Sequence, residues 1–312
     1  MINYSIIIPH HNIPDLLQRC LDSIPDRDDL EIIIVDDNSS SEIVDFSNFP
    51  GTHRKNCHVF FDKEGGGAGH ARNLALKKAR GKRLIFSDAD DFFMPCFNDV
   101  LDASINIEAD VIYTAVCCLD TEFYTNVPFM ANHIDRMLNT YNKNKTKGEL
   151  LLRYRHTLPW AKIIKRDLVE KNNIHFDETI VANDVTFSYM IGYYAKKIKI
   201  EPHAIYCYTI RQKSLSRIET DETNMARVYV MGRANLFFRE KDLPIKEVYQ
   251  YEQLVKSFLK NQRMFYREWN LLKNMGYSSK NLYYNSVLCF FKMSVQKACR
   301  LVKRCILVMV DE

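Results

Sequence analysis

The sequence predicts an α/β protein with a mostly parallel sheet flanked by helices, followed by a C-terminal helical extension. First, short apolar runs alternate with segments of helical spacing over about the first 118 residues. Second, these runs are continuously apolar, which is typical of parallel strands buried on both faces. Third, apolar positions keep helical spacing from residue 218 towards the C-terminus. We therefore expect two parts, residues 1–217 and 218–312.

The alternation of strands and helices in residues 1–118 is typical of the nucleotide-binding half of an α/β fold. Strands are predicted at residues 4–9, 31–35, 57–61, 84–86 and 111–115. Asn12 can cap a first helix that extends to Ile24, and further helices are predicted at residues 70–79 and 97–107. Right-handed crossovers would bring the carboxyl ends of these strands to one edge of the sheet.

The pattern is weaker in the second half, residues 119–217, where the polar run 142–147 indicates an exposed loop before a helix. Strands are predicted at residues 160–164, 198–200 and 204–209, and helices at residues 166–171 and 184–194. In the extension, helices are predicted at residues 228–239, 248–273 and 282–310.

Composition limits the class of protein. The 312 residues are 46% hydrophobic and 26% charged with a net charge of +4, so we expect a globular chain that does not bind nucleic acid. Residues 1–4 show no secretory signal, and no apolar run approaches the roughly 20 residues of a membrane span. Nine cysteines without a CxxC pair argue against disulfides and zinc, so we expect a cytoplasmic protein.

An acidic turn follows the apolar run 84–86. Asp88 and Asp90 lie two residues apart on an extended chain and project to the same side. Hard oxygen ligands at the end of a parallel strand suit Mn²⁺ or Mg²⁺ shared with substrate phosphates. The alternative is a solvated turn. An EF-hand loop is excluded, because Phe93 stands where the turn glycine is required.

Polar groups follow four of the predicted strands. They are His11 with Asn12, Asp37, the glycine-rich turn before Arg72, and the acidic turn. Because parallel strands bring their carboxyl ends to a common edge, one crevice would hold a ring for a base, a carboxylate for a base or ribose, glycines and metal ligands. This set of groups predicts a site for a nucleotide diphosphate.

With these pieces in place, the sequence resembles the inverting family 2 glycosyltransferases of the GT-A fold, which include bacterial capsule and O-antigen enzymes. The matching segments, in the order of the family, are residues 5–12, 34–39, 69–73, 88–91 with Pro95, 160–162, 183–184 and 208–214. The resemblance implies a metal-dependent transferase that moves a sugar from a nucleotide-diphosphate donor to a glycan or lipid-linked glycan in surface polysaccharide synthesis. A UDP-sugar is the first candidate for the donor.

The resemblance also implies roles for individual residues. Asp184 would be the catalytic base, and Asp90 with Asp88 would hold the Mn²⁺ or Mg²⁺ ion. The residues implied in donor binding are Pro9, His11, Asn12, Asp37, Gly69, Arg72, Asp88, Ala89 and Arg211. The residues implied on the acceptor side are Trp160, Lys162 and Asn183. The chain departs from the family where Asn183 replaces a glutamate and His11 an aromatic residue, and where the segment 208–214 lacks a glycine.

Several residues have plainer interpretations. Asp184 could be an acid favoured by the dipole of a helix N-terminus, and Trp160 could be a core residue. The glycine run 65–69 could indicate a dinucleotide-dependent oxidoreductase, but His70 stands at its closing glycine position. A non-catalytic nucleotide-binding or glycan-binding subunit is the remaining alternative.

The last predicted helix has an apolar face with basic residues interleaved. Its apolar face is formed by Leu282, Tyr283, Val287, Phe290, Phe291, Ser294, Ala298, Leu301, Cys305, Leu307 and Val308, and its basic residues are Lys280, Lys292, Lys297, Arg300, Lys303 and Arg304. Such a helix suits an anionic membrane surface, which would make the protein peripheral on the inner face of the cytoplasmic membrane. Alternatively, this face packs on the catalytic domain or on a second copy, which would give a homo-oligomer.

Overall fold

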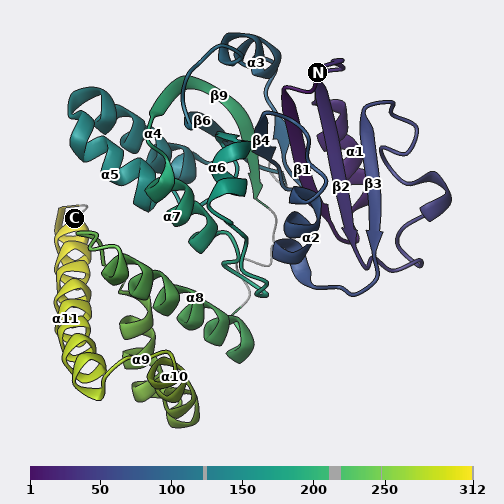
Figure 1. Cartoon of the computed structure of the whole chain (residues 1–312). Helices are drawn as coiled ribbons and strands as arrows, with labels where there is room; N and C mark the ends of the chain where they lie inside the picture. Colours follow the sequence, from purple (N-terminus) through teal and green to yellow (C-terminus); the bar gives the residue numbers. More distant parts are fainter. Residues whose placement is uncertain (122–124, 211–218, 247, 311–312) are drawn as a thin grey trace. The chain divides into compact units, whose positions relative to one another are not determined.

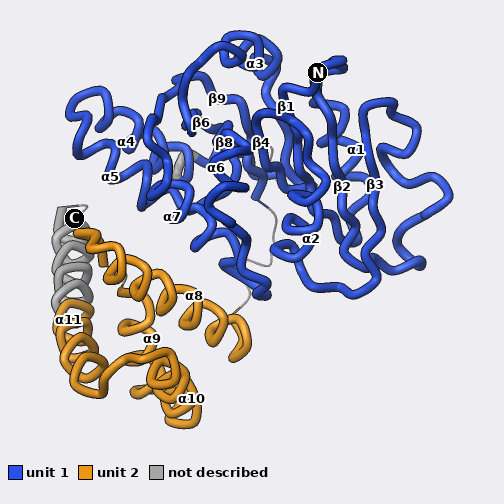
Figure 2. Tube along the Cα trace, in the orientation of Figure 1, with its two compact units in different colours: residues 1–217 blue, residues 218–312 orange. Residues whose placement is uncertain are grey.

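The computed structural model describes residues 1–121, 125–210, 219–246 and 248–310. The chain divides into two compact units, residues 1–217 and 218–312, which Figure 2 shows in different colours. The first unit contains all the strands described, and the second is helical. Each unit has its own apolar core.

The first unit is built on one sheet of nine strands (Figure 1). The strands are β1 (Tyr4–His10), β2 (Leu30–Asp37), β3 (Cys57–Asp62), β4 (Arg83–Phe86), β5 (Phe92–Phe93), β6 (Val111–Asp120), β7 (Thr125–Asn126), β8 (Lys162–Lys165) and β9 (Ile198–Ile210). Their order across the sheet is β3-β2-β1-β4-β8-β6-β9-β5, with β7 paired to β6. Strands β1, β2, β3, β4, β6 and β9 point the same way, whereas β5, β7 and β8 run opposite. This confirms the predicted α/β fold with a mostly parallel sheet.

The apolar runs explain the parallel half of the sheet. All seven residues of β1 and all eight of β2 are buried, as expected for strands covered on both faces. Helix α2 packs against β1 and β2 on one of those faces. The two strands predicted at 198–200 and 204–209 form the single strand β9, because register shifts near Ala115 let β6 and β9 stay paired past Pro202.

The helices of the first unit connect these strands. They are α1 (Pro14–Asp22), the 3-10 helix η1 (Phe46–Asn48), α2 (Gly67–Leu76), α3 (Phe97–Ser104), α4 (Pro128–Lys143), α5 (Lys145–Arg155), α6 (Arg166–Lys171) and α7 (Val185–Tyr194). The predicted loop at 142–147 is wrong. Asn144 ends α4 and caps α5, where its side chain accepts a hydrogen bond from the Lys147 backbone N–H. The lysines on either side of Asn144 therefore belong to the two helices and not to a loop.

The second unit consists of α8 (Asp221–Glu240), α9 (Tyr249–Lys260), α10 (Gln262–Asn274) and α11 (Ser279–Val310). The single helix predicted at 248–273 is wrong, because Asn261 has a non-helical backbone (φ −151°, ψ 87°) and caps α10 by accepting from the Met264 backbone N–H. Buried Val228, Leu254 and Leu272 from three of these helices form the core, which Leu282 of α11 completes.

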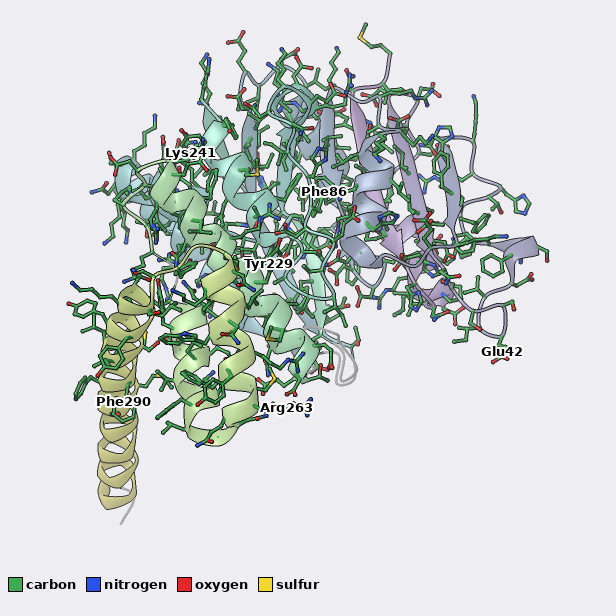
Figure 3. All side chains as sticks on the ribbon, turned by 60° about the horizontal axis from the view of Figure 1, so that its bottom comes forward. Glu42, Phe86, Tyr229, Lys241, Arg263 and Phe290 are labelled. Carbon is green, nitrogen blue, oxygen red and sulfur yellow. The ribbon has the colours of Figure 1, made fainter. Side chains whose placement is uncertain are left out.

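Helix α11 presents aromatic side chains to the surface. Tyr283, Tyr284 and Phe291 are exposed, and Figure 3 shows the labelled Phe290 on the same helix. Side chains beyond Ser294 lie outside the description, including those of the predicted apolar and basic positions from Lys297 to Val308. Among the described residues, no helix is both long and apolar enough to span a membrane.

Candidate active site

The acidic turn leaves the sheet at the end of β4, as predicted. Asp88 and Asp90 are partly exposed there, whereas Ala89 between them is buried. The Asp88 carboxylate accepts a hydrogen bond of 2.5 Å from Arg72, and the Asp90 backbone carbonyl accepts one from Arg19. The turn is therefore fixed by its backbone and by Arg72.

Asp91 is a buried anchor for this turn. Its carboxylate accepts hydrogen bonds from the Tyr206 hydroxyl at 2.6 Å and from the Thr209 backbone N–H at 2.7 Å. The Tyr206 oxygen in turn accepts from the Asp88 backbone N–H at 2.9 Å. Burial, with Asp90 and Asp88 nearby, raises the pKa of Asp91 well above its usual range. Asp91 and Tyr206 thus join the acidic turn to strand β9.

The ends of β1 and β2 are joined by a chain of hydrogen bonds. Asn12 has a left-handed backbone (φ 56°) and its side-chain oxygen accepts from the Ser40 backbone N–H at 2.8 Å. Its amide nitrogen lies 2.8 Å from Nε2 of His11, whose Nδ1 lies 2.7 Å from the Asp37 carbonyl oxygen. Asn12 therefore does not cap α1, where Ile13 holds the N-cap position. Because Ser40 fixes the orientation of the Asn12 amide, Nε2 of His11 is the acceptor and Nδ1 carries the proton.

The glycine-rich turn meets the same strand end. The Gly67 backbone N–H donates to both carboxylate oxygens of Asp37, at 3.1 and 3.0 Å. Gly65 and Gly67 have φ values of 71° and 84°, which side chains disfavour. The turn thus brings the Gly67 backbone N–H to a carboxylate predicted to bind the base or ribose.

Arg72 connects two parts of the site. It is buried, and its guanidinium donates to Asp88 and, at 2.9 Å, to the side-chain oxygen of Asn183. Asn183 precedes Asp184, so one side chain spans the distance between the acidic turn and the predicted base. The structure therefore brings Arg72, Asp88, Asn183 and Asp184 together.

Asp184 stands at the N-cap position of α7, but its side chain makes no capping hydrogen bond. Burial raises the pKa of Asp184 to about 6, even though Arg72 and Lys162 act to lower it. A pKa in this range suits a carboxylate that must accept a proton near neutral pH. Asp184 therefore makes no capping contact, and its place at the N-terminus of α7 fits the helix-dipole interpretation as well as that of a base.

Lys162 and Trp160 lie inside the unit. Lys162 is 1% exposed and donates to the His156 carbonyl at 2.8 Å and to the Ser188 hydroxyl at 3.1 Å. Burial lowers the pKa of Lys162 to about 7. Trp160 is buried and stacks on Tyr206 and Tyr208, with ring centroids 5.2 and 5.4 Å apart. Trp160 precedes β8, and Lys162 is the first residue of that strand.

The remaining predicted residues have simple placements. Pro9 is buried within β1 opposite Val35, one residue before the strand end. Gly69 is buried against the loop that precedes Asp184, where an added Cβ would lie 2.1 Å from the Asp177 carbonyl oxygen. Arg211 lies outside the described residues.

The acidic turn fits a divalent cation by its chemistry. Asp88 and Asp90 offer carboxylate oxygens at a strand end, and both side chains keep contact with solvent. Asp91, the third acid, is committed to Tyr206 and Thr209 and does not fit as a ligand. Another acidic group, Asp62 and Glu64 with His70, has potential ligand atoms within 4.8 Å of one another, but His70 also contacts Glu178.

Sequence reasoning missed the residues that hold the site together. Asp91 was visible as an extra acid next to the pair, but its partner Tyr206 lies more than a hundred residues away. In the sequence Asn73 stands only within the motif 69–73, whereas in the structure its side-chain amide bonds the backbone of Phe176. No short-range pattern gives either contact.

Comparison with known proteins identifies the family of this chain. The fold is a mostly parallel sheet with a candidate ligand site at the carboxyl ends of its strands. The family model described as "Glycosyl transferase family 2" matches residues 5–192, and the chain belongs to this family. The predicted class of enzyme, a glycosyltransferase, is thereby confirmed.

Two curated relatives show similar sequences. The chain is 25% identical over 225 residues to "Uncharacterized glycosyltransferase EpsJ" of Bacillus subtilis (strain 168), covering 69% of this chain and 63% of EpsJ. It is 25% identical over 224 residues to "Poly(ribitol-phosphate) beta-N-acetylglucosaminyltransferase TarS" of Staphylococcus aureus (strain MW2), covering 68% of this chain and 36% of TarS. The chain thus spans less than two thirds of either relative.

Two solved structures share the fold. S. aureus TarS 1-349 in complex with UDP-GlcNAc aligns with a TM-score of 0.60 and 19% identity, covering 86% of this chain and 79% of that one. The mannosyltransferase PcManGT from Pyrobaculum calidifontis, in complex with GDP-Man and Mn²⁺, aligns with a TM-score of 0.51 and 16% identity, covering 96% and 80%. Together with the family match, they confirm the predicted GT-A fold.

Proposed function

We propose that this glycosyltransferase is metal-dependent and inverting. It would transfer a sugar from a nucleotide-diphosphate donor, with a UDP-sugar as the first candidate, to a glycan acceptor. One observation carries the proposal: Arg72 joins Asp88 of the acidic turn to Asn183, the neighbour of Asp184. The carboxylate proposed to bind the donor and the carboxyl proposed to accept a proton would thus belong to one site.

The donor would occupy the edge formed by the ends of β1, β2 and β4. His11 offers an exposed ring for the base, and Asp37 lies beside it as an acceptor for base or ribose. Asp90 and Asp88 would hold Mn²⁺ or Mg²⁺, which when bound supplies positive charge for the departing diphosphate. The UDP-GlcNAc and the GDP-Man with Mn²⁺ in the two similar structures support this class of donor.

Asp184 would act on the acceptor. An ionised Asp184 removes the proton from the acceptor hydroxyl as its oxygen attacks the anomeric carbon opposite the diphosphate, which inverts the configuration. General-base assistance of this kind is typically worth about 10²–10⁴-fold in rate. The buried ammonium of Lys162 favours the ionised form of Asp184 against the cost of burial.

The acceptor would be a growing surface polysaccharide or its lipid-linked precursor. The name of TarS, a poly(ribitol-phosphate) transferase, supports a polymer acceptor. A lipid-linked acceptor would place the enzyme at the inner face of the cytoplasmic membrane. The exposed aromatic side chains Tyr283, Tyr284 and Phe291 of α11 would then lie in the interface of the bilayer.

The proposal is tested with a panel of nucleotide sugars, including UDP-glucose, UDP-GlcNAc and GDP-mannose. We expect slow release of UDP from at least one of the UDP-sugars, or of GDP from GDP-mannose, dependent on Mn²⁺ or Mg²⁺ and stopped by EDTA. Unchanged turnover in EDTA would contradict the proposed metal dependence. Binding of donors without any turnover would favour the alternative that the protein is a non-catalytic binding subunit. Anomeric configuration, followed by NMR of the product, tests inversion.

A further inference from the structure

The loop that carries Asp184 is fastened to helix α2 by Asn73. This loop, residues 172–184, connects α6 with α7. The Asn73 amide nitrogen donates to the Phe176 carbonyl at 3.1 Å, and its oxygen accepts from the Phe176 backbone N–H at 2.9 Å. One side chain thus satisfies both backbone groups of Phe176, as a neighbouring strand would. Both groups are buried, so the pair is protected from competition by water.

Neighbouring residues of α2 extend the contact along the loop. The Asn73 amide also donates to Glu178 at 3.0 Å, and the second carboxylate oxygen of Glu178 lies 3.1 Å from Nδ1 of His70. The hydrogen bond with Glu178 raises the pKa of His70, which favours a charged pair. Gly69 lets the loop approach closely, because an added Cβ there would lie 2.1 Å from the Asp177 carbonyl oxygen.

The loop is also closed on itself next to Asp184. The Asp177 backbone N–H donates to the Asn183 carbonyl at 2.9 Å, so the segment fixed by α2 is joined directly to the residue before the base. Ala182 has a left-handed backbone (φ 59°), a strained conformation that persists only when its surroundings impose it. The fastened residues 176–178 therefore determine where residues 183–184 lie.

We infer that Asn73 is a positioning residue, which holds the loop 176–184 so that Asp184 faces the reacting sugar. The inference rests on the proposed function of Asp184 as base. Asn73 itself belongs to the helix that carries Arg72, so the donor side and the base share one rigid support. Arg72 completes the support by bonding Asp88 and Asn183 and by lying 5.3 Å from the Phe176 ring.

The variant Asn73→Ala separates this role from donor binding. It removes the bonds to Phe176 and Glu178 and leaves His11, Asp37 and Asp90 in place. A displacement of about 1 Å in a catalytic group can cost about 10²-fold. We expect kcat to fall about 10–100-fold, while the KM for the donor and the affinity for UDP with Mn²⁺ change less than about twofold.

A second readout follows the environment of Asp184. Arg72 of α2, Asp88 after β4 and Lys162 of β8 are the charged groups that act on this carboxyl. When the loop loosens, water reaches the carboxyl and its pKa falls from about 6 towards its ordinary value. The acid limb of the kcat profile should therefore move to lower pH in Asn73→Ala, which a uniform loss of stability would not cause.

The matched control is Asn56→Ala. The Asn56 amide donates to the Leu30 carbonyl at 3.2 Å, and its oxygen accepts from Arg54, in the turn before β3, far in sequence from the loop. It tests the general cost of removing a half-buried asparagine, and its kcat and acid limb should match the wild type. Glu178→Ala, a milder change at a half-exposed residue, keeps the bonds to Phe176 and should give a smaller effect in the same direction.

Hydrogen exchange of residues 176–184 gives a result that does not depend on activity. Faster exchange in Asn73→Ala than in Asn56→Ala, together with the kcat loss, supports the inference. Wild-type exchange, or a rise in donor KM with kcat unchanged, overturns it. If the wild type turns over no nucleotide sugar, the proposed function fails instead, and the exchange result alone decides whether Asn73 holds the loop.

Discussion

Replacing Asp184 by asparagine should make the protein less active and more stable at the same time. Asparagine has nearly the same shape but cannot accept the proton of an acceptor hydroxyl. We expect kcat to fall by about 10²–10⁴-fold, with the affinity for UDP nearly unchanged because the base acts on the acceptor. The second effect follows from the burial of the carboxyl.

The gain in stability can be worked out from the pKa of Asp184. The folded value is about 6 and the ordinary value is 3.8, so the folded state binds the proton more tightly than the unfolded state does. With a raised pKa, the ionised carboxylate destabilises the fold, and its cost grows as pH rises from about 4 to about 6. A difference of about 2 units corresponds to about 3 kcal/mol at pH 8. Loss of the charge that partners Lys162 reduces this gain.

Urea unfolding of wild type and Asp184→Asn at pH 8 and pH 4 measures the effect. The variant should be more stable by about 1–3 kcal/mol at pH 8, and the difference should vanish near pH 4, where the wild-type carboxyl is also neutral. Asp167→Asn is the control, because Asp167 is half-exposed in a surface pair with Lys171 and should lose up to about 1 kcal/mol. Equal or lower stability of Asp184→Asn at pH 8 would refute the reasoning.

Three further predictions concern the metal, the turn and the tail. Asp90→Ala should abolish transfer and metal-dependent donor binding while circular dichroism shows an intact fold; retained metal-dependent binding would exclude Asp90 as a ligand. Tyr206→Phe should cost about 1–3 kcal/mol in urea unfolding and weaken activation by Mn²⁺, whereas Tyr4→Phe, which also removes a buried hydroxyl bond, should affect stability alone. A double change of Tyr283 and Phe291 to serine should abolish flotation with anionic liposomes at low salt. If the wild-type protein itself does not float with the liposomes, the proposed membrane binding is wrong.

The parallel half of the sheet was predictable because β1, β2, β3, β4 and β6 each carry their own apolar signal, whereas the two-residue strands β5 and β7 do not. The run Ile6–Ile8 is apolar on both faces and therefore had to be buried in a parallel sheet. The place of the carboxyl ends was also predictable, because parallel strands bring these ends to the same edge of the sheet. This is why Asp37 and Asp88 could be predicted to lie at one edge of the sheet.

Elements that depend on a single capping residue could not be predicted from periodicity. Asn144 and Asn261 each interrupt a pattern that reads as one continuous segment, and each does so with a side-chain bond to the next helix. An asparagine in an exposed loop and an asparagine that caps a helix look the same in the sequence. Only the backbone conformation of the asparagine distinguishes the two cases.

The contacts that assemble the site could not be predicted from the sequence, for a different physical reason. Arg72 could bind a phosphate or a carboxylate with equal chemistry, and the sequence does not reveal that Asp88 and Asn183 occupy it. This pairing has a consequence for the reaction. If the acidic turn binds a diphosphate as proposed, the diphosphate must share Arg72 with Asp88 or displace it, and a movement of Arg72 would also move its partner Asn183 beside Asp184. Under the proposed function, donor binding and the placement of Asp184 would therefore be linked through the Arg72 guanidinium.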